Sequence, residues 1–151
     1  MAHCEFRVAT PEDIQEILRT VRQENVAELE MIGVGIDTSL DWSLRNSCEA
    51  YVALIDGDVV CAFGVVATHD PNMGTPWMVG TSVIDKHSIA FLRTSKQVVD
   101  KLLERWPILR NFADARNARG LRWLRFMKFD IDPNGVCLNG FKFHQFEKRR
   151  L

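Results

Sequence analysis

The first thirty residues change from an alternating pattern to a helical one at Thr10. Residues 5–9 read EFRVA and predict a short strand. The following TPEDIQEILRTVRQENVAEL places apolar side chains at helical spacing and predicts an amphipathic helix that ends before Gly33. Thr10 suits the N-cap, Pro11 suits the first helical position, and Asp13 completes a pair typical of a capping box.

Apolar, β-branched segments dominate the middle of the chain. A loop and a short helix beginning near Thr38 or Ser39 are expected first. CEAYVALIDGDVVCAFGVVATH then reads as two strands around Asp56 and Gly57, a dipeptide typical of a hairpin turn. HDPNMGTP is turn material, and PWMVGTSVI predicts a third core strand.

The second half of the chain alternates helices and strands. SIAFLRTSKQVVDKLLERWP predicts a long helix, with Thr94 or Ser95 as its N-cap and Pro107 at its end. ILRNFADAR predicts a strand, DARNARGLRWLRFMKF a third helix, IDPNG a turn and FKFHQFEKR a closing strand. The predicted buried stripe of the long helix is Val98, Val99, Leu102, Leu103 and Trp106.

This order of elements predicts one α+β domain over residues 1–151, with a mixed central sheet and helices on both faces. The chain of 151 residues is long enough for one substantial core, and it shows no linker or repeat. Its 46% hydrophobic and 26% charged residues are typical of a soluble globular protein.

Charge and cysteine usage exclude several classes of function. A formal net charge of -1 provides no global attraction to nucleic acid or membrane, so any basic site must be local. No apolar stretch approaches the roughly 20 residues of a membrane span, and the polar start EFRVATPEDIQ is unlike a signal peptide. No cysteines lie at C-x-x-C spacing, so we expect no metal site, and we expect buried free thiols in a reducing compartment.

Basic residues recur at every third position from 116 to 128, with large apolar side chains between them. Steps of three drift by about 60° each on a helix, so these charges form no single phosphate-binding face. We expect a packed helix with arginines over its rim. Arginine and tryptophan are enriched at protein interfaces, although the two tryptophans outside this segment also suit the edge of a core. The predicted interface residues are Arg119, Arg122, Trp123, Arg125, Trp42 and Trp77.

The element order resembles that of the GNAT acyltransferases. The pattern N-x-x-x-L-x-x-L-x-x-M-x-F from Asn117 to Phe129 resembles the last sequence block of that superfamily. The chain also resembles a family of small proteins from short-tailed bacteriophages. The segments that carry this resemblance are FRVATPEDI, PWMVGTSVIDKH, FLRTSKQVVD, RWLRFMKF and FHQFE. Its members carry names such as internal virion protein A and are GNAT-like in fold. That resemblance implies a virion or assembly role at the portal, core or tail.

The GNAT resemblance also implies which groups catalysis would require. The superfamily binds the coenzyme A pyrophosphate at a glycine-containing turn between the fourth strand and the next helix, whereas DKHSIAFLRTSKQVVDKL has no glycine. The remaining candidates for an anion are Arg93, Thr94, Ser95 and Lys96, which equally suit a helix cap and a solvated first turn.

The sequence also departs from the superfamily pattern in its proton-transfer groups. In the superfamily a tyrosine often acts as general acid toward the departing thiolate. The position that aligns with it here is Leu124, which donates no proton. Asp85 and His87 are candidates for a base with an orienting partner, or are part of a polar loop. Glu49 and His69 are further candidates for the base.

Two of the three requirements fail, so the first hypothesis is a non-enzymatic phage virion or assembly protein that uses no cofactor. It binds other phage structural proteins and resides in the virion, or in the host cytoplasm during assembly. The alternative is an acetyl-CoA-dependent N-acetyltransferase of the GNAT type with an atypical cofactor loop. A third hypothesis is non-specific contact with DNA, which would depend steeply on salt.

Overall fold

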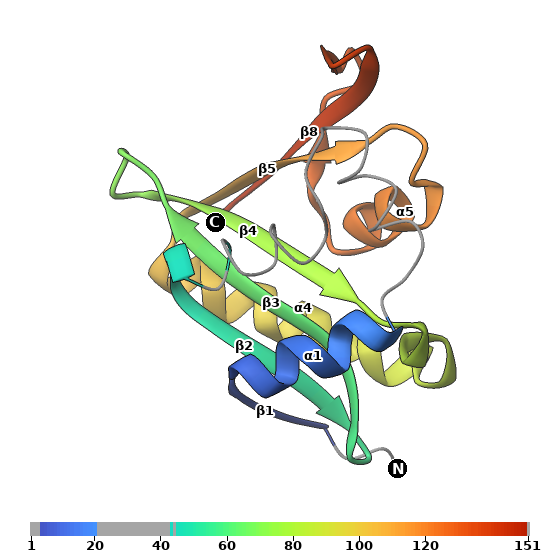
Figure 1. The fold of residues 1–151 in the computed structure, drawn as a ribbon. Helices are drawn as coiled ribbons and strands as arrows, with labels where there is room; N and C mark the ends of the chain where they lie inside the picture. The colour runs from blue at the N-terminus through green and yellow to red at the C-terminus, as the bar shows by residue number, and fades with distance from the viewer. Residues whose placement is uncertain (1–3, 21–42, 44, 151) are drawn as a thin grey trace.

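The computed structural model describes residues 4–20, 43 and 45–150. Its strands form one eight-stranded sheet in the order β1-β2-β3-β4-β5-β8-β6, with β7 paired to β8 (Figure 1). The pairs are antiparallel except for β4 with β5, so the sheet is mixed as predicted. The strands are β1 Cys4–Val8, β2 Ser47–Ile55, β3 Asp58–Ala67, β4 Met73–Gly80, β5 Ile108–Asp114, β6 Asp130–Ile131, β7 Val136–Leu138 and β8 Phe141–Arg149.

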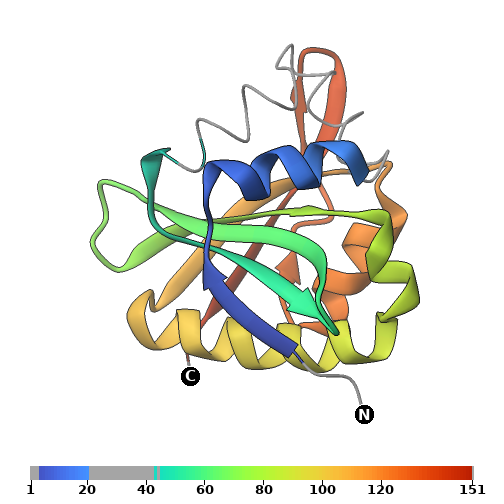
Figure 2. The same ribbon diagram turned by 60° about the horizontal axis from the view of Figure 1, so that its bottom comes forward.

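Helices cover both faces of this sheet (Figure 2). One face packs on α1 (Pro11–Thr20) through Ile17, which lies in a buried cluster with Val52 and Ala62. The other face packs on α4 (Ser88–Arg105) and α5 (Ala118–Phe126). The α+β prediction with helices on both faces is confirmed.

Local sequence signals account for several of these elements. Asp56 and Gly57 have positive φ values of 52° and 85°, as a tight hairpin turn between β2 and β3 requires. Thr10 and Asp13 exchange hydrogen bonds at the start of α1, from Thr10 N to Asp13 Oδ2 at 2.8 Å and from Asp13 N to Thr10 Oγ1 at 3.4 Å. The predicted capping pair is therefore confirmed.

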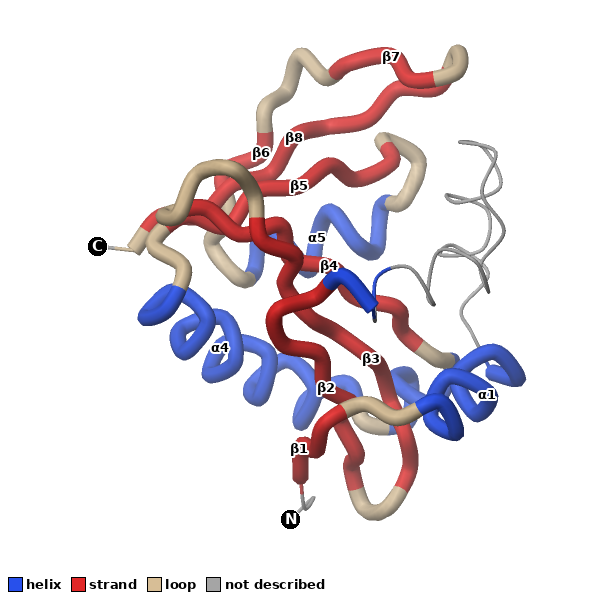
Figure 3. Tube along the Cα trace, turned by 60° about the vertical axis from the view of Figure 1, so that its left-hand side comes forward, coloured by secondary structure: helices blue, strands red, loops and turns tan. Residues whose placement is uncertain are grey.

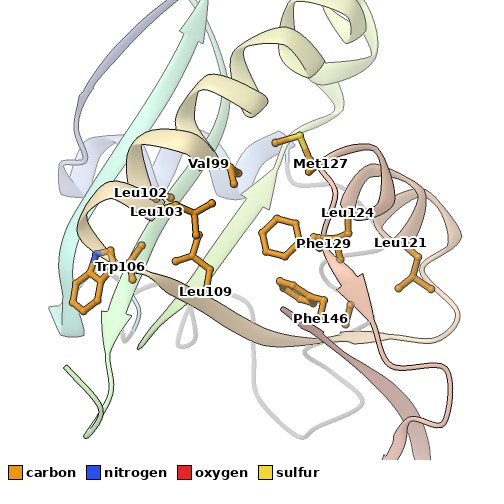
Figure 4. Close-up of a cluster of buried hydrophobic side chains, with 12 residues drawn as sticks. Val99, Leu102, Leu103, Trp106, Leu109, Leu121, Leu124, Met127, Phe129 and Phe146 are labelled. Carbon is orange, nitrogen blue, oxygen red and sulfur yellow. The ribbon is translucent and has the colours of Figure 1, made fainter. Parts of the chain in front are cut away.

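The largest core cluster lies between α4, α5 and the second half of the sheet (Figure 4). Leu109 of β5 is fully buried, Met127 is 1% exposed, and the rings of Phe129 and Phe146 meet edge to face at 5.3 Å. The predicted stripe of α4 contributes here, with Val99, Leu102, Leu103 and Trp106 buried. This packing holds α4 and α5 on the same face of the sheet.

Two sequence predictions differ from the structure, and one lies outside the described residues. The third core strand begins at Met73, three residues before the predicted start, and ends at Gly80; Ser82–Lys86 form a 3-10 helix, η1. The chain turns there because the Thr81 hydroxyl donates to the carbonyl oxygens of Val59 and Val60. The segment predicted as a turn near IDPNG also contributes the short strands β6 and β7. The predicted helix near Thr38 or Ser39 lies outside the described residues.

Candidate functional site

The parallel strands β4 and β5 pair only at their beginnings. Met73 lies opposite Ile108 and Gly74 opposite Leu109, and the ladder ends there in the described part of the chain. The strands then run apart toward η1 and α5, and Figure 3 shows β1–β4 and β5–β8 as two groups of strands. Such a separation leaves the facing backbone edges without strand partners.

A side-chain amide occupies the start of this separation. Asn111 of β5 donates from Nδ2 to the carbonyl oxygen of Pro76 in β4 at 2.7 Å. Pro76 carries no N–H, so this position leaves no donor unpaired at the point of separation. Backbone groups of successive strand residues point alternately to opposite neighbours, so Met78 faces the same gap as Pro76. The edge of β4 therefore presents a backbone N–H and C=O to the gap at Met78.

A cleft with a volume of about 170 Å³ lies beyond the open ends of the two strands. We call it the polar cleft, and it is lined by Met78, Ile84, Asp85, Ser88, Phe91, Leu92, Asn117, Arg119, Gly120 and Trp123. The N-termini of α4 and α5 both face it, through Ser88 and through Asn117 with Gly120. Two helix N-termini on one cleft create a partial positive charge that favours an anion.

The two helix N-termini are capped differently. Asn117 caps α5, because its Oδ1 accepts from the Gly120 N–H at 2.9 Å. A Cβ on Gly120 would lie 2.6 Å from Asn117 Nδ2, so glycine is what allows this cap to sit so close. His87 precedes α4 and makes no side-chain capping hydrogen bond. The first N–H groups of α4 are therefore not used by a side-chain cap.

An ion pair spans the mouth of the polar cleft. Asp85 of η1 accepts a hydrogen bond from Arg119 of α5, and both side chains remain about half exposed. A carboxylate thus already lies against the cation that faces the cleft.

An apolar cavity with a volume of about 110 Å³ continues from the polar cleft beneath the sheet. The cleft and the cavity share Met78, Phe91 and Trp123, and the last two rings stack at 5.9 Å. Trp123 Nε1 is buried without a hydrogen-bond partner among the described residues. Burial raises the pKa of Cys61 in the cavity wall to about 12, as expected of an apolar environment.

The predicted base and its orienting partner do not meet. Asp85 pairs with Arg119, whereas His87 Nε2 lies 3.3 Å from Asp58 Oδ2 at the start of β3. The prediction that Asp85 orients His87 is wrong, because η1 turns the two side chains toward different elements. Glu49 also has a structural partner, since its Oε2 lies 2.8 Å from Arg105 Nη1.

The predicted anion-binding residues lie inside α4 and not at its N-terminus, because the helix begins at Ser88. Thr94 donates to Cys4 Sγ at 3.3 Å, and the buried Ser95 donates to the Phe91 carbonyl oxygen at 2.7 Å. Lys96 Nζ lies 4.3 Å from the centre of the Phe126 ring, and Arg93 is exposed. Capping by Thr94 or Ser95 is wrong, and the structure places none of these four residues in the polar cleft.

The predicted interface residues divide into two groups. Arg119, Arg122 and Arg125 are exposed on α5. Trp77 and Trp123 are only partly exposed, since Trp77 Nε1 donates to Ser47 Oγ at 2.7 Å and Trp123 stacks in the core. These two tryptophans are therefore core-edge residues and not exposed anchors. Trp42 lies outside the described residues.

Sequence reasoning missed Asn111 and Ser88, which lie beside the separated strands and in the cleft. Both depend on long-range pairing, so no local pattern identified them. Asn117 was part of the quoted pattern, but its capping role was not predicted. No helix in the described part of the chain is long and apolar enough to cross a membrane. The described residues also contain no group of three or more His, Cys, Asp or Glu that could hold a metal ion.

Comparison with known proteins identifies the architecture. No protein-family model and no curated protein matches the chain. An aminoglycoside acetyltransferase in complex with coenzyme A is 12% identical, with 98% of this chain and 95% of that one covered and a TM-score of 0.73. A GNAT acetyltransferase from Streptococcus pneumoniae is 15% identical, with 97% and 99% covered and a TM-score of 0.60. RimL, a ribosomal alpha-N-protein acetyltransferase in complex with coenzyme A, is 13% identical, with 97% and 93% covered and a TM-score of 0.66.

These neighbours correct two expectations. The non-enzymatic phage virion or assembly protein is contradicted, because the structures that match nearly the whole chain are acetyltransferases. The expectation that no cofactor is used is contradicted as well, because two of the three are complexes with coenzyme A. Phage partners, DNA contact and location in the virion or host cytoplasm are tested by none of these observations and stay predictions. At identities of 12–15% the likeness establishes the fold alone, and that fold is the GNAT acetyltransferase fold.

Proposed function

We propose that this protein is a GNAT-type N-acetyltransferase that takes acetyl-coenzyme A as its acyl donor. The observation that carries the proposal is the polar cleft, where the separated ends of β4 and β5, two helix N-termini and Arg119 lie together. An extended donor with a phosphorylated end and a less polar reactive end suits a cleft of this kind, which continues into an apolar cavity.

Ser88, Gly120 and Arg119 are the residues that would hold the phosphates. The N-terminal N–H groups of α4 and α5 supply partial positive charge, and Arg119 supplies a full one. The segment between β4 and α4 lacks the glycines of the superfamily, so its backbone cannot approach a phosphate as closely. Arg119, from the opposite side of the cleft, compensates for that loss with a charged donor.

Met78 and Trp123 would hold the amide-rich arm of the donor. The backbone of Met78 faces the gap between the strands, and an extended arm with amide groups can pair with it as a further strand would. Trp123 Nε1 adds a buried donor that has no partner among the described residues. Buried donors are nearly always satisfied in native proteins, so a partner supplied by a ligand is the natural explanation.

The donor supplies a thioester carbonyl that an acceptor amine attacks. The described residues place no acid at Leu124, whose side chain is 5% exposed and packed in the core. A thiol near the ordinary cysteine pKa of about 8.5 is a fair leaving group without a proton donor. The protein then contributes chiefly by orienting the two reactants.

The test is a binding measurement followed by an activity assay. Melting curves of the full chain are recorded with acetyl-coenzyme A, with free coenzyme A, and with ADP as a control that carries a nucleotide and its diphosphate but no amide arm or thioester. At 100 times its dissociation constant a ligand stabilises the native state by about 2.7 kcal/mol, and each kcal/mol raises the Tm of a chain of this size by about 2–4 °C.

We therefore expect an increase in Tm of about 5–10 °C with acetyl-coenzyme A and a smaller one with ADP. Release of free thiol in the presence of an amine panel would establish transfer. No increase in Tm at millimolar acetyl-coenzyme A would contradict the proposal.

A further inference from the structure

The apolar cavity owes its existence to small side chains that face each other. Ala53 and Cys61 line it from the sheet and belong to a buried cluster with Phe91 of α4, and Thr94 and Ser95 line it from α4. Protein interiors are close-packed, and a void of about 110 Å³ is larger than ordinary packing defects. The small residues on both sides therefore keep open a space that larger ones would fill.

The polar atoms of this wall are already in use. The hydroxyl of Thr94 donates to Cys4 Sγ, and that of Ser95 donates to the Phe91 carbonyl oxygen in the same helix. Ordered water requires two to four polar partners, and only Trp123 Nε1 is an unpartnered buried polar atom in this wall among the described residues. That N–H is the donor assigned above to the arm at the entrance, so the wall beyond it has no unpartnered buried polar atom among the described residues and suits an apolar group.

The cavity is reached from the polar cleft. Met78, Phe91 and Trp123 belong to both, so a thioester whose phosphates lie near Arg119 directs its acyl group past these three side chains. An engineered apolar cavity of about 150 Å³ holds benzene, with six carbons, so by proportion about 110 Å³ holds a chain of about four carbons.

We propose that the apolar cavity binds the acyl chain of the donor and that the protein prefers acyl groups of about four carbons to acetyl. This inference rests on the proposed function and refines it. The transfer itself is unchanged: the acceptor nitrogen bonds to the acyl carbon, the carbon–sulfur bond breaks, its electron pair leaves with sulfur, and the nitrogen loses its proton to solvent.

The test is a titration of the full chain with acetyl-, butyryl- and hexanoyl-coenzyme A, followed by calorimetry. Burial of one methylene raises affinity by about four-fold, and butyryl has two more than acetyl, so butyryl-coenzyme A is expected to bind about 15-fold more tightly than the acetyl thioester. Hexanoyl-coenzyme A should bring little further gain, because its chain exceeds the cavity.

Two variants fill the cavity and one matched variant does not. Val98→Phe adds a ring from α4, and Thr94→Leu adds bulk at a neighbouring position, so the preference for butyryl should fall to about one-fold in each while acetyl-coenzyme A still binds. Val8→Phe is the matched control for Val98→Phe, because it also replaces valine with phenylalanine but at a position that is 69% exposed and outside the cavity. This variant should keep the preference for butyryl-coenzyme A. If Val98→Phe does not fold, the Thr94→Leu variant and the thioester series on the unmodified chain still test the chain-length preference.

The outcomes separate the two proposals. Equal affinities for acetyl- and butyryl-coenzyme A on the unmodified chain would overturn the chain-length inference and leave the acetyltransferase proposal standing. A preference that survives in a folded Val98→Phe or Thr94→Leu variant would also overturn the inference. Failure of every thioester to bind would contradict the proposed function, and the inference with it.

Discussion

Asp85 and Arg119 form an ion pair that joins η1 to α5 across the mouth of the polar cleft. The two residues are 34 positions apart in the chain and meet because β4 and β5 are parallel, so the elements that follow them, η1 and α5, both begin at the same edge of the sheet. Any phosphate that binds there competes with Asp85 for the guanidinium of Arg119. The pair therefore lowers the affinity of the cleft for an anion while it keeps Arg119 in place.

Removal of either charge should change coenzyme A affinity in opposite directions. Exposed ion pairs are worth up to about 1 kcal/mol, so Asp85→Asn should tighten binding by about two- to five-fold. Arg119→Gln removes a charge-assisted donor worth about 1.5–3 kcal/mol and should weaken binding about ten-fold or more. Calorimetry measures both. Arg122→Gln, an exposed arginine on the same helix, is the control and should bind normally; weaker binding by Asp85→Asn would contradict the competition.

Asn111 should stabilise the point at which β4 and β5 separate. Asn111→Leu keeps the size of the side chain but removes the donor to the Pro76 carbonyl oxygen. The bond is part-buried, and a typical hydrogen bond contributes about 0.5–1.5 kcal/mol net, so we expect a loss of about 1 kcal/mol in urea unfolding. Asn72→Leu is the matched control at an exposed site and should change the free energy of unfolding by less than about 0.5 kcal/mol. Similar values for both variants would show that the amide bridge contributes nothing.

Asp13 should make stability depend on pH below about 4. Burial of this carboxyl opposes ionisation, but hydrogen bonds from Arg7 and Thr10 outweigh it and hold the pKa of Asp13 below its ordinary value. A lowered folded pKa provides stability that is present above the unfolded value of about 3.9 and is lost as pH falls through the folded value. Asp13→Asn should therefore be less stable than the unmodified chain at pH 7.

The same variant should lose less stability between pH 5 and pH 2. Urea unfolding across this range measures the difference. Glu12→Gln, on the exposed side of the same helix, serves as control and should keep the pH dependence of the unmodified chain. If the free energy of unfolding of Asp13→Asn falls with pH as steeply as that of the unmodified chain, Asp13 is not the cause of the pH dependence.

The four cysteines should react at very different rates with a thiol reagent. Cys48 and Cys137 are exposed and should be modified in the native protein at pH 8. Cys61 is 2% exposed and has a pKa raised to about 12, so it should react only after unfolding. Mass spectrometry after timed labelling identifies the sites. Rapid native modification of Cys61 would mean that the apolar cavity opens readily to solvent.

Much of the fold follows from local signals. The hairpin at Asp56 and Gly57, the capping pair at Thr10 and Asp13, and the closing strand Phe141–Arg149 were all predicted correctly, because each depends on residues within a few positions of one another. The resemblance to GNAT proteins, drawn from the element order, is also confirmed at the level of the fold.

Function was predicted less well, because the sequence was compared with superfamily patterns one motif at a time. The missing glycines and the leucine at position 124 led to the expectation of a non-enzymatic protein without a cofactor. Those absences are real, but the cleft is assembled from other groups: Arg119 comes from α5, and the uncapped N-terminus of α4 comes from Ser88. The N-cap of the long helix had been predicted at Thr94 or Ser95, whereas α4 begins at Ser88.

The sequence by itself determined the helices, most of the strands and the turn chemistry, since hydrophobic period and capping act over a few residues. Only the tertiary structure decided where β4 and β5 stop pairing, that Asp85 faces Arg119 and not His87, and that small residues of the sheet and α4 enclose a cavity. The physical reason is that strand pairing and side-chain packing bring together residues that are far apart in the chain. The local pattern of hydrophobic residues does not specify which of these residues come into contact.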